Sequence, residues 1–175
     1  MTYLDVLSKR LAFLLRHDRK AFDKGYIDTK GWRSMDELIQ KHGFTKDELL
    51  EIVKTDRKGR YEINELNKIR AVQGHSIPVE VDLVESQPPD ILYHGTSSKF
   101  IESIMQEGIK NETRLYVHLS QDKNVAMEVG KRHGGDCVII TIDAKRMYED
   151  GIKFFLSKNG VWLVKYVSTK YMLDT

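Results

Sequence analysis

The run TKDELLEIVKTDRKGRYEI, residues 45–63, joins a helix start, a charged turn and a strand in direct succession. Thr45 and Glu48 have the spacing of a capping box, in which each side chain satisfies a backbone N–H at the start of a helix. Leu49 and Leu50 follow as the first apolar helical positions. The charged segment 54–59 interrupts the helical pattern, and residues 61–63 are candidates for a short strand. The run therefore predicts a helix that leads into a β element.

Two more helices are expected before this run. Over residues 3–17 an amphipathic helix is predicted, because five leucines recur at helical spacing: Leu4, Leu7, Leu11, Leu14 and Leu15. A second capping box, Ser34 and Glu37, begins another helix just before Leu38. Residues 69–72 are a further strand candidate. Three helices followed by a small β element is the order of a winged-helix-like lobe.

The rear of the chain has a different texture. The segment 82–90 contains Pro88 and Pro89 and is the expected boundary, so we divide the chain into lobes 1–86 and 87–175. The second lobe alternates strand candidates with two helical patterns, at 99–107 and 123–133. The strand candidates are 91–94, 115–119, 137–143, 153–156 and 161–167. The predicted fold class is therefore α+β, with two lobes.

Composition limits the class of protein. The chain has 175 residues, 41% hydrophobic and 31% charged, which is an ordinary globular mixture. No apolar run is long enough to span a membrane, and the N-terminus resembles a charged amphipathic helix more than a signal peptide. The single cysteine, Cys137, excludes an internal disulfide and fits a reducing compartment. The six histidines lack metal-ligand spacing. We expect a cytoplasmic monomer with no membrane segment and no metal.

Charge divides unevenly between the halves. Residues 1–75 carry 16 Lys and Arg against 12 Asp and Glu, a net charge of +4, whereas residues 76–175 carry 12 against 14, a net charge of −2. A polyanion is therefore expected to dock mainly on the first half.

Two groups of polar residues in the first lobe could perform chemistry. Arg16 and His17 end the first predicted helix, where cations commonly complement the helix dipole. The alternative is a guanidinium that grips phosphate, beside an imidazole that moves a proton. The second group is either a polar hairpin end or a binding site around Gly74, formed by Arg70, His75 and Ser76.

The second lobe offers three further candidates. At 94–96, His94, Gly95 and Thr96 form either a helix cap or a ligand site that the glycine opens. His118 and Ser120 alternate with apolar residues, so they line a cleft or a solvated strand edge. Arg132 stands in an ordinary helix-end sequence. Neither a P-loop nor a Gly-x-Gly-x-x-Gly turn occurs, so kinase and Rossmann dehydrogenase classes are unsupported.

Together these segments resemble the RNA 2′-phosphotransferase family, also called tRNA 2′-phosphotransferase, in order and over nearly the whole chain. The resemblance implies an N-terminal winged-helix-like RNA lobe and a C-terminal ADP-ribosyltransferase-like NAD⁺ lobe. The matching stretches are 14–17, 28–32, 69–76, 92–96, 116–120, 130–134 and 159–163. The run 18–20 and the segment 166–170 depart from the family by lacking its usual prolines, which affects loop geometry.

The resemblance also implies roles for individual residues. A catalytic tetrad that holds phosphate is carried over onto Arg16, His17, Arg70 and Arg132, with His75 and Ser76 beside it on the RNA side. NAD⁺ is expected to contact His94, Gly95, Thr96, His118, Ser120 and Val161. His94, His118 and Val161 fill the superfamily's three signature strand positions, and Val161 replaces the glutamate that activates acceptors in many protein-modifying relatives.

The implied reaction has two steps. An internal RNA 2′-phosphate, as in a tRNA-like substrate, attacks the NAD⁺ ribose and expels nicotinamide. The ribose then takes the phosphate, which releases RNA with a free 2′-hydroxyl and ADP-ribose 1″,2″-cyclic phosphate. Two alternatives remain: an ADP-ribosyltransferase that caps terminal nucleic-acid phosphates or modifies a protein, and a winged-helix RNA-binding module with an inactive second lobe.

Overall fold

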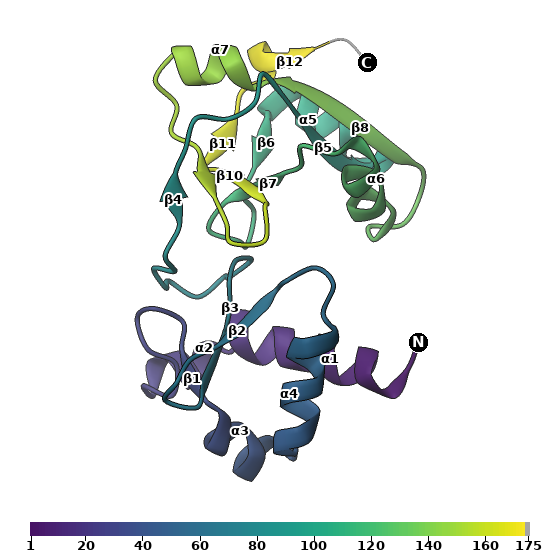
Figure 1. The fold of residues 1–175 in the computed structure, drawn as a ribbon. Helices are drawn as coiled ribbons and strands as arrows, with labels where there is room; N and C mark the ends of the chain where they lie inside the picture. The colour runs from purple at the N-terminus through teal and green to yellow at the C-terminus, as the bar shows by residue number, and fades with distance from the viewer. Residues whose placement is uncertain (174–175) are drawn as a thin grey trace. The chain divides into compact units, whose positions relative to one another are not determined.

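The computed structural model describes residues 1–173, which form two compact units, Met1–Asp82 and the chain from Leu83 onwards (Figure 1). We had expected the boundary after residue 86. Strand β4 (Val84–Glu85) explains the difference, because it pairs antiparallel with β9 (Phe155–Leu156) of the second unit. Both units mix helices and strands, so the α+β class is confirmed. Within the described residues, no helix combines the length and apolar character that a membrane crossing requires.

The first unit packs four helices against a small antiparallel sheet of order β1-β3-β2. Its elements are α1 (Tyr3–Arg16), α2 (Arg19–Asp23), β1 (Arg33–Ser34), α3 (Met35–His42), α4 (Lys46–Thr55), β2 (Tyr61–Ile63) and β3 (Lys68–Ala71). The apolar faces of α1, α3 and α4 bury a core with β2 and β3. The leucine spacing of α1 gave its inward face correctly, since Leu7, Leu11, Leu14 and Leu15 are all buried.

The two predicted capping boxes have different outcomes. At α4 the box is complete, because Thr45 accepts from the Glu48 backbone and Glu48 accepts from the Thr45 backbone. At α3 only half forms: Ser34 Oγ accepts from Glu37 N at 3.3 Å. The Glu37 carboxylate instead binds both Nε and Nη2 of Arg33, at 2.7 and 3.0 Å. A charged hydrogen bond is roughly twice as strong as a neutral one, which explains why arginine wins.

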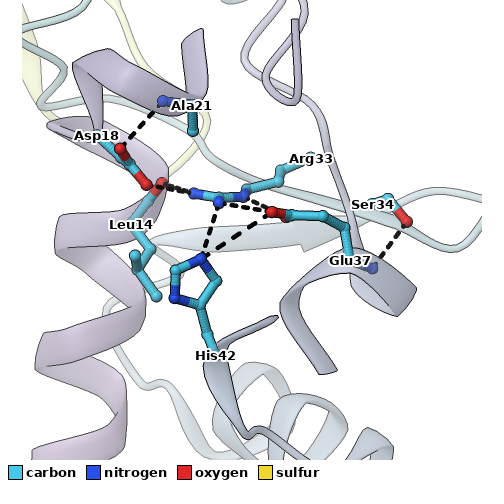
Figure 2. A network of polar contacts seen from close by, with 7 residues as sticks. All are labelled: Leu14, Asp18, Ala21, Arg33, Ser34, Glu37 and His42. Atoms are coloured by element: carbon cyan, nitrogen blue, oxygen red, sulfur yellow. Dashed lines mark hydrogen bonds and ion pairs between the residues drawn. The ribbon is translucent and has the colours of Figure 1, made fainter. Parts of the chain in front are cut away.

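Arg33 is the centre of a polar network inside the first unit (Figure 2). Its guanidinium is 1% exposed and donates to Glu37, to Asp18 Oδ2 at 3.0 Å and to the Leu14 carbonyl oxygen at 2.8 Å. Nη2 also lies 3.1 Å from His42 Nε2, which must accept because arginine only donates. Burial and then the Arg33 charge lower the pKa of His42, consistent with a neutral ring. The network joins the end of α1 to the start of α2 and to α3.

The second unit is built on two sheets that meet at one bridge. Sheet β4-β9-β10-β7 and sheet β12-β8-β5 are joined by paired backbone bonds between Tyr93 and Ser120. A third, two-stranded sheet pairs β11 with β6. The remaining elements are β5 (Ile91–Ser97), η1 (Ser98–Phe100), α5 (Ile101–Glu107), β6 (Ile109–Lys110), β7 (Val117–Leu119), α6 (Lys123–Lys131), β8 (Cys137–Asp143), α7 (Ala144–Glu149), β10 (Trp162–Val164), β11 (Tyr166–Val167), η2 (Thr169–Tyr171) and β12 (Met172–Leu173).

Several local predictions for this unit need correction. The strand predicted at 91–94 continues to Ser97, because seven successive residues pair with β8. The single strand expected at 161–167 is two strands, β10 and β11, which pair with different partners. Helix α7 was not expected. Its N-cap is Asp143, whose side chain accepts from Arg146 N at 3.0 Å.

Helix α6 lies unusually close to β5, and two glycines make this possible. A Cβ added at Gly95 would overlap the backbone carbonyl of Ala126. A Cβ added at Gly130 would stand 3.0 Å from Thr96 N and against the Cys137 sulfur. The two glycines face each other where the helix crosses the strand. From sequence we had assigned Gly95 to ligand approach, whereas the space beside its Cα is filled by α6.

Gly95→Ala should therefore destabilise the second unit. Overpacking commonly costs about 1–3 kcal/mol, and we expect a loss of at least this size. The added methyl meets backbone, which cannot rotate away. Gly130→Ala should be milder because its nearest obstacle is the end of a side chain. Thermal unfolding followed by circular dichroism measures both, with exposed Lys131→Ala as the control on the same helix. An unchanged Tm for Gly95→Ala would contradict this packing.

Candidate functional site

In the first unit, the end of α1 is bound to the segment that follows β3. The Arg16 carbonyl oxygen accepts from the backbone N–H groups of Ser76, at 3.0 Å, and Ile77, at 3.4 Å. Gly74 has φ +92°, and a Cβ there would stand 3.0 Å from Arg16 Nε. The guanidinium therefore lies against the Gly74 backbone. Two features therefore require glycine at position 74: its left-handed backbone conformation and the close approach of the Arg16 side chain.

His17, the C-cap of α1, forms a side-chain pair with Ser76. His17 Nδ1 and Ser76 Oγ are 2.8 Å apart, and the same Oγ lies 3.5 Å from the Arg16 carbonyl oxygen, to which it can donate. When the imidazole is protonated, Nδ1 must be the donor and the hydroxyl the acceptor. The Ser76 hydroxyl can then donate its own hydrogen bond to the Arg16 carbonyl oxygen at the end of the helix. The serine thus fixes the orientation of the His17 ring.

His75 is the most strongly perturbed group of the first unit. It is 3% exposed, and its pKa is lowered to about 3, first by burial and then by the charges of Arg16, His17 and Arg70. Its Nε2 atom has no hydrogen-bond partner among residues 1–173. His75 is therefore a neutral imidazole surrounded by cations. The structure brings together all five residues that the sequence proposed for this lobe: Arg16, His17, Arg70, His75 and Ser76.

Arg70 is buried, and each of its three guanidinium nitrogens donates one hydrogen bond within its own unit. Nε donates to Glu62, Nη1 donates to the Lys30 carbonyl oxygen at 3.0 Å, and Nη2 donates to Asp82 Oδ2 at 3.0 Å. Its guanidinium also stacks over the Trp32 ring, 4.3 Å from the centroid. Asp82 is the exposed member of this set. A phosphate that reaches Arg70 must therefore displace the Asp82 carboxylate or bind beside it.

In the second unit, two histidines have tautomers fixed by backbone carbonyls. His94 Nδ1 lies 3.1 Å from the His118 carbonyl oxygen, and His118 Nδ1 lies 3.1 Å from that of Tyr116. A carbonyl only accepts, so Nδ1 carries the hydrogen in both rings and Nε2 holds the lone pair when the ring is neutral. Burial lowers the pKa of His94, with a smaller contribution from the charge of His133.

The other candidates of this unit lie on adjoining strands. Gly95 and Thr96 are in β5, and Thr96 is 4% exposed. Ser120 follows β7 and makes the bridge to Tyr93. Val161 precedes β10, and its backbone N–H donates to Ser157 Oγ at 3.0 Å. Strand β10 pairs with β7 so that Leu163 faces His118.

Arg132 is an exposed residue that caps the C-terminus of α6. The pKa of Arg114 is lowered, first by desolvation and then by the charge of Arg132, so the two guanidinium groups are neighbours. Sequence reasoning missed Arg114, because it stands in a loop with no recognisable motif. The tetrad that combines Arg132 with Arg16, His17 and Arg70 stays a prediction.

Comparison with known proteins identifies the family of this chain. The model of the RNA 2′-phosphotransferase, Tpt1/KptA family matches residues 3–166. Three bacterial relatives carry the name "Probable RNA 2′-phosphotransferase". The relative from Flavobacterium johnsoniae is 46% identical (95% of this chain, 93% of the relative), that from Fusobacterium nucleatum 45% (95% and 96%), and that from Pseudomonas savastanoi 44% (94% and 90%). The chain therefore belongs to the RNA 2′-phosphotransferase family.

The buried His75 predicts a pH-dependent stability of the first unit. The folded pKa is about 3 and the unfolded value is 6.5, so the unfolded chain binds an extra proton between these limits. Stability falls as pH drops below 6.5, by about 1.4 kcal/mol for each pH unit. Between pH 6.5 and pH 5 the loss is therefore about 2 kcal/mol. His75→Gln should remove this loss, and urea unfolding at pH 7 and pH 5 measures it.

The exposed His133→Gln in the other unit is the control for the loss of a histidine as such. Equal losses of stability in wild type and His75→Gln on acidification would show that His75 is not held neutral.

Proposed function

We propose that this protein is an NAD⁺-dependent RNA 2′-phosphotransferase, which removes an internal 2′-phosphate from RNA. The observation that carries the proposal is the cluster of Arg16, His17 and Ser76 around the end of α1, in a chain of this family. Guanidinium groups stay charged and match the geometry of phosphate. RNA bearing the phosphate is assigned to the first unit, whose helices and small sheet support a winged-helix-like lobe.

The second unit is proposed to be the ADP-ribosyltransferase-like lobe that binds NAD⁺. Two features support this assignment: the two sheets that meet at the Tyr93–Ser120 bridge, and the contact of the His94 ring with the His118 backbone. With Nδ1 bound to a carbonyl, the neutral ring of His94 presents Nε2 as an acceptor. Ribose hydroxyls are donors, so this ring suits a ribose. Val161 offers no general base, and an anionic phosphate acceptor requires none.

In the first step, bound NAD⁺ supplies an activated ribose carbon with nicotinamide as its leaving group. The protein has to bring the 2′-phosphate to that carbon and screen the repulsion between phosphates. Arg16 is assigned to the phosphate directly. Arg70 is assigned to it through the edge that Asp82 now occupies. Arg132 is proposed to act in the second step, when charge builds on phosphorus oxygens.

His17 is proposed as the proton donor and acceptor of the reaction, with Ser76 as a positioning residue. Ser76→Ala removes the group that holds Nδ1, so the ring should lose its fixed orientation. A neutral hydrogen bond contributes 0.5–1.5 kcal/mol, so turnover should fall about two- to tenfold with little change in RNA binding. Ser76→Thr keeps the hydroxyl and should restore most of the activity.

Steady-state kinetics separates kcat from KM for these two variants, and ¹⁵N spectra of the imidazoles show which nitrogen of His17 carries the hydrogen. Unchanged kcat in Ser76→Ala, with an unchanged His17 spectrum, would exclude the positioning role.

The function itself is tested with an oligonucleotide that carries one internal 2′-phosphate, with and without NAD⁺ and with and without EDTA. We expect RNA with a free 2′-hydroxyl, nicotinamide and ADP-ribose 1″,2″-cyclic phosphate, only when NAD⁺ is present and equally in EDTA. Metal independence and NAD⁺ dependence are both proposals that this assay decides. Turnover without NAD⁺, or none with EDTA, would contradict them.

An oligonucleotide with only a terminal phosphate separates the nearest alternative. An ADP-ribosyltransferase that caps ends would modify this RNA and stop, leaving an ADP-ribosylated phosphate. An inactive RNA-binding module would release no nicotinamide from either substrate. The complete two-step product from the internal 2′-phosphate is expected only of the phosphotransferase.

A further inference from the structure

Helix α1 exposes an aromatic ring beside His17 that the proposed reaction does not use. Phe13 is 56% exposed, although it belongs to a helix whose other large apolar positions include four buried leucines. Its ring centroid lies 6.0 Å from that of His17, one helical turn further on, with the planes tilted by 49°. A large exposed ring costs hydration free energy unless something covers it in the working state.

The charges that α1 carries on either side of this ring are all positive. Between Ser8 and His17 the charged side chains of α1 are Lys9, Arg10 and Arg16, and this segment has no carboxylate. Lys9 and Arg10 are exposed like Phe13. Helical geometry places residues 9, 10, 13, 16 and 17 on adjacent positions of one outward face. An aromatic ring among cations is the surface that single-stranded nucleic acid binds, with phosphates on the cations and bases on the ring.

We propose that Phe13 is a stacking platform for one nucleobase of the RNA, belonging either to the 2′-phosphorylated nucleotide or to the nucleotide next to it. The proposal rests on the proposed function, because it takes the phosphate to lie at Arg16 and His17. A base and its own 2′-phosphate share one ribose, so a phosphate at His17 brings a base within reach of a ring one turn away. Stacking tolerates any base, so Phe13 gives affinity and local geometry without selecting a sequence.

Residues 1–76 contain no stripe of aromatic residues, which indicates little selection among bases, and a single stacking ring agrees with that. A single ring is sufficient when the site binds one phosphorylated nucleotide. The sequence did not predict that Phe13 is exposed, because a helical pattern counts phenylalanine and leucine alike as apolar residues.

The test compares RNA binding by wild type, Phe13→Ala, Phe13→Trp and the control Val6→Ala, without NAD⁺ so that no reaction occurs. Val6 is 51% exposed and lies on the same helix face two turns earlier. The probes are short labelled oligonucleotides with one internal 2′-phosphate, and matched versions in which the base of that nucleotide or of either neighbour is absent. Loss of one stacked base commonly costs about 1–3 kcal/mol, which is roughly a 5- to 150-fold change in Kd.

We expect Phe13→Ala to weaken binding of the complete oligonucleotide within that range, and Phe13→Trp and Val6→Ala to leave it close to wild type. The penalty of Phe13→Ala should vanish for one of the abasic probes, because no base remains to be lost. A penalty that is equal on all probes would overturn the proposal, as would no penalty at all. If Phe13→Ala changes only self-association, seen by sedimentation, the ring covers a second copy and the proposal is wrong.

An oligonucleotide without the 2′-phosphate keeps this test separate from the proposed function. If wild type binds both oligonucleotides equally, the phosphate site fails whatever Phe13 does. If wild type prefers the phosphorylated one and Phe13→Ala shows no base-dependent penalty, only the stacking proposal fails.

Discussion

The hydrogen bonding of Arg33 is the constraint on which the first unit depends. A guanidinium that is 1% exposed survives in an interior only when its donors are paired, since breaking a buried ion pair commonly costs about 3–5 kcal/mol. Glu37 and Asp18 neutralise the charge of Arg33. The Leu14 carbonyl oxygen and His42 Nε2 accept further hydrogen bonds from it. The groups come from α1, from the start of α2 and from α3, so the position of each element is tied to the others.

This network matters for the site because it holds the end of α1 from the inside. The last carbonyl groups of a helix have no partner within it. Here the Arg33 guanidinium donates to the Leu14 carbonyl oxygen. The backbone N–H groups of Ser76 and Ile77 donate to the Arg16 carbonyl oxygen. The helix end that presents Arg16 and His17 is therefore gripped on two sides. Arg16 is the basic residue of the last turn of α1, and its charge there complements the helix dipole as well as a phosphate.

Short-range chemistry was predictable from the sequence and long-range pairing was not. Leucine spacing gave the buried face of α1, and the Thr45–Glu48 box gave the start of α4. The Ser34–Glu37 box failed in half, because Glu37 binds a buried arginine that no local pattern marks. The pairing of His17 with Ser76 joins residues far apart in sequence, so only family resemblance placed them in one site. Gly95 was noticed, but its reason is a helix from another part of the chain.

In each unit, burial lowers the pKa of one histidine, and the effect suits the ligand proposed for that unit. In the first unit, burial keeps His75 toward the neutral form, whereas Arg16 and Arg70 carry a positive charge that does not depend on pH near neutrality. A phosphate grip built in this way keeps its strength across the physiological range. In the second unit, His94 is also held toward the neutral form, and a backbone carbonyl fixes its tautomer. A neutral acceptor suits a hydroxyl, whereas an imidazolium would repel a cationic nicotinamide ring. Burial thus leaves the charge of the first cluster to its other cations and holds His94 toward the neutral form, a division that suits the proposed reaction between a phosphate and NAD⁺.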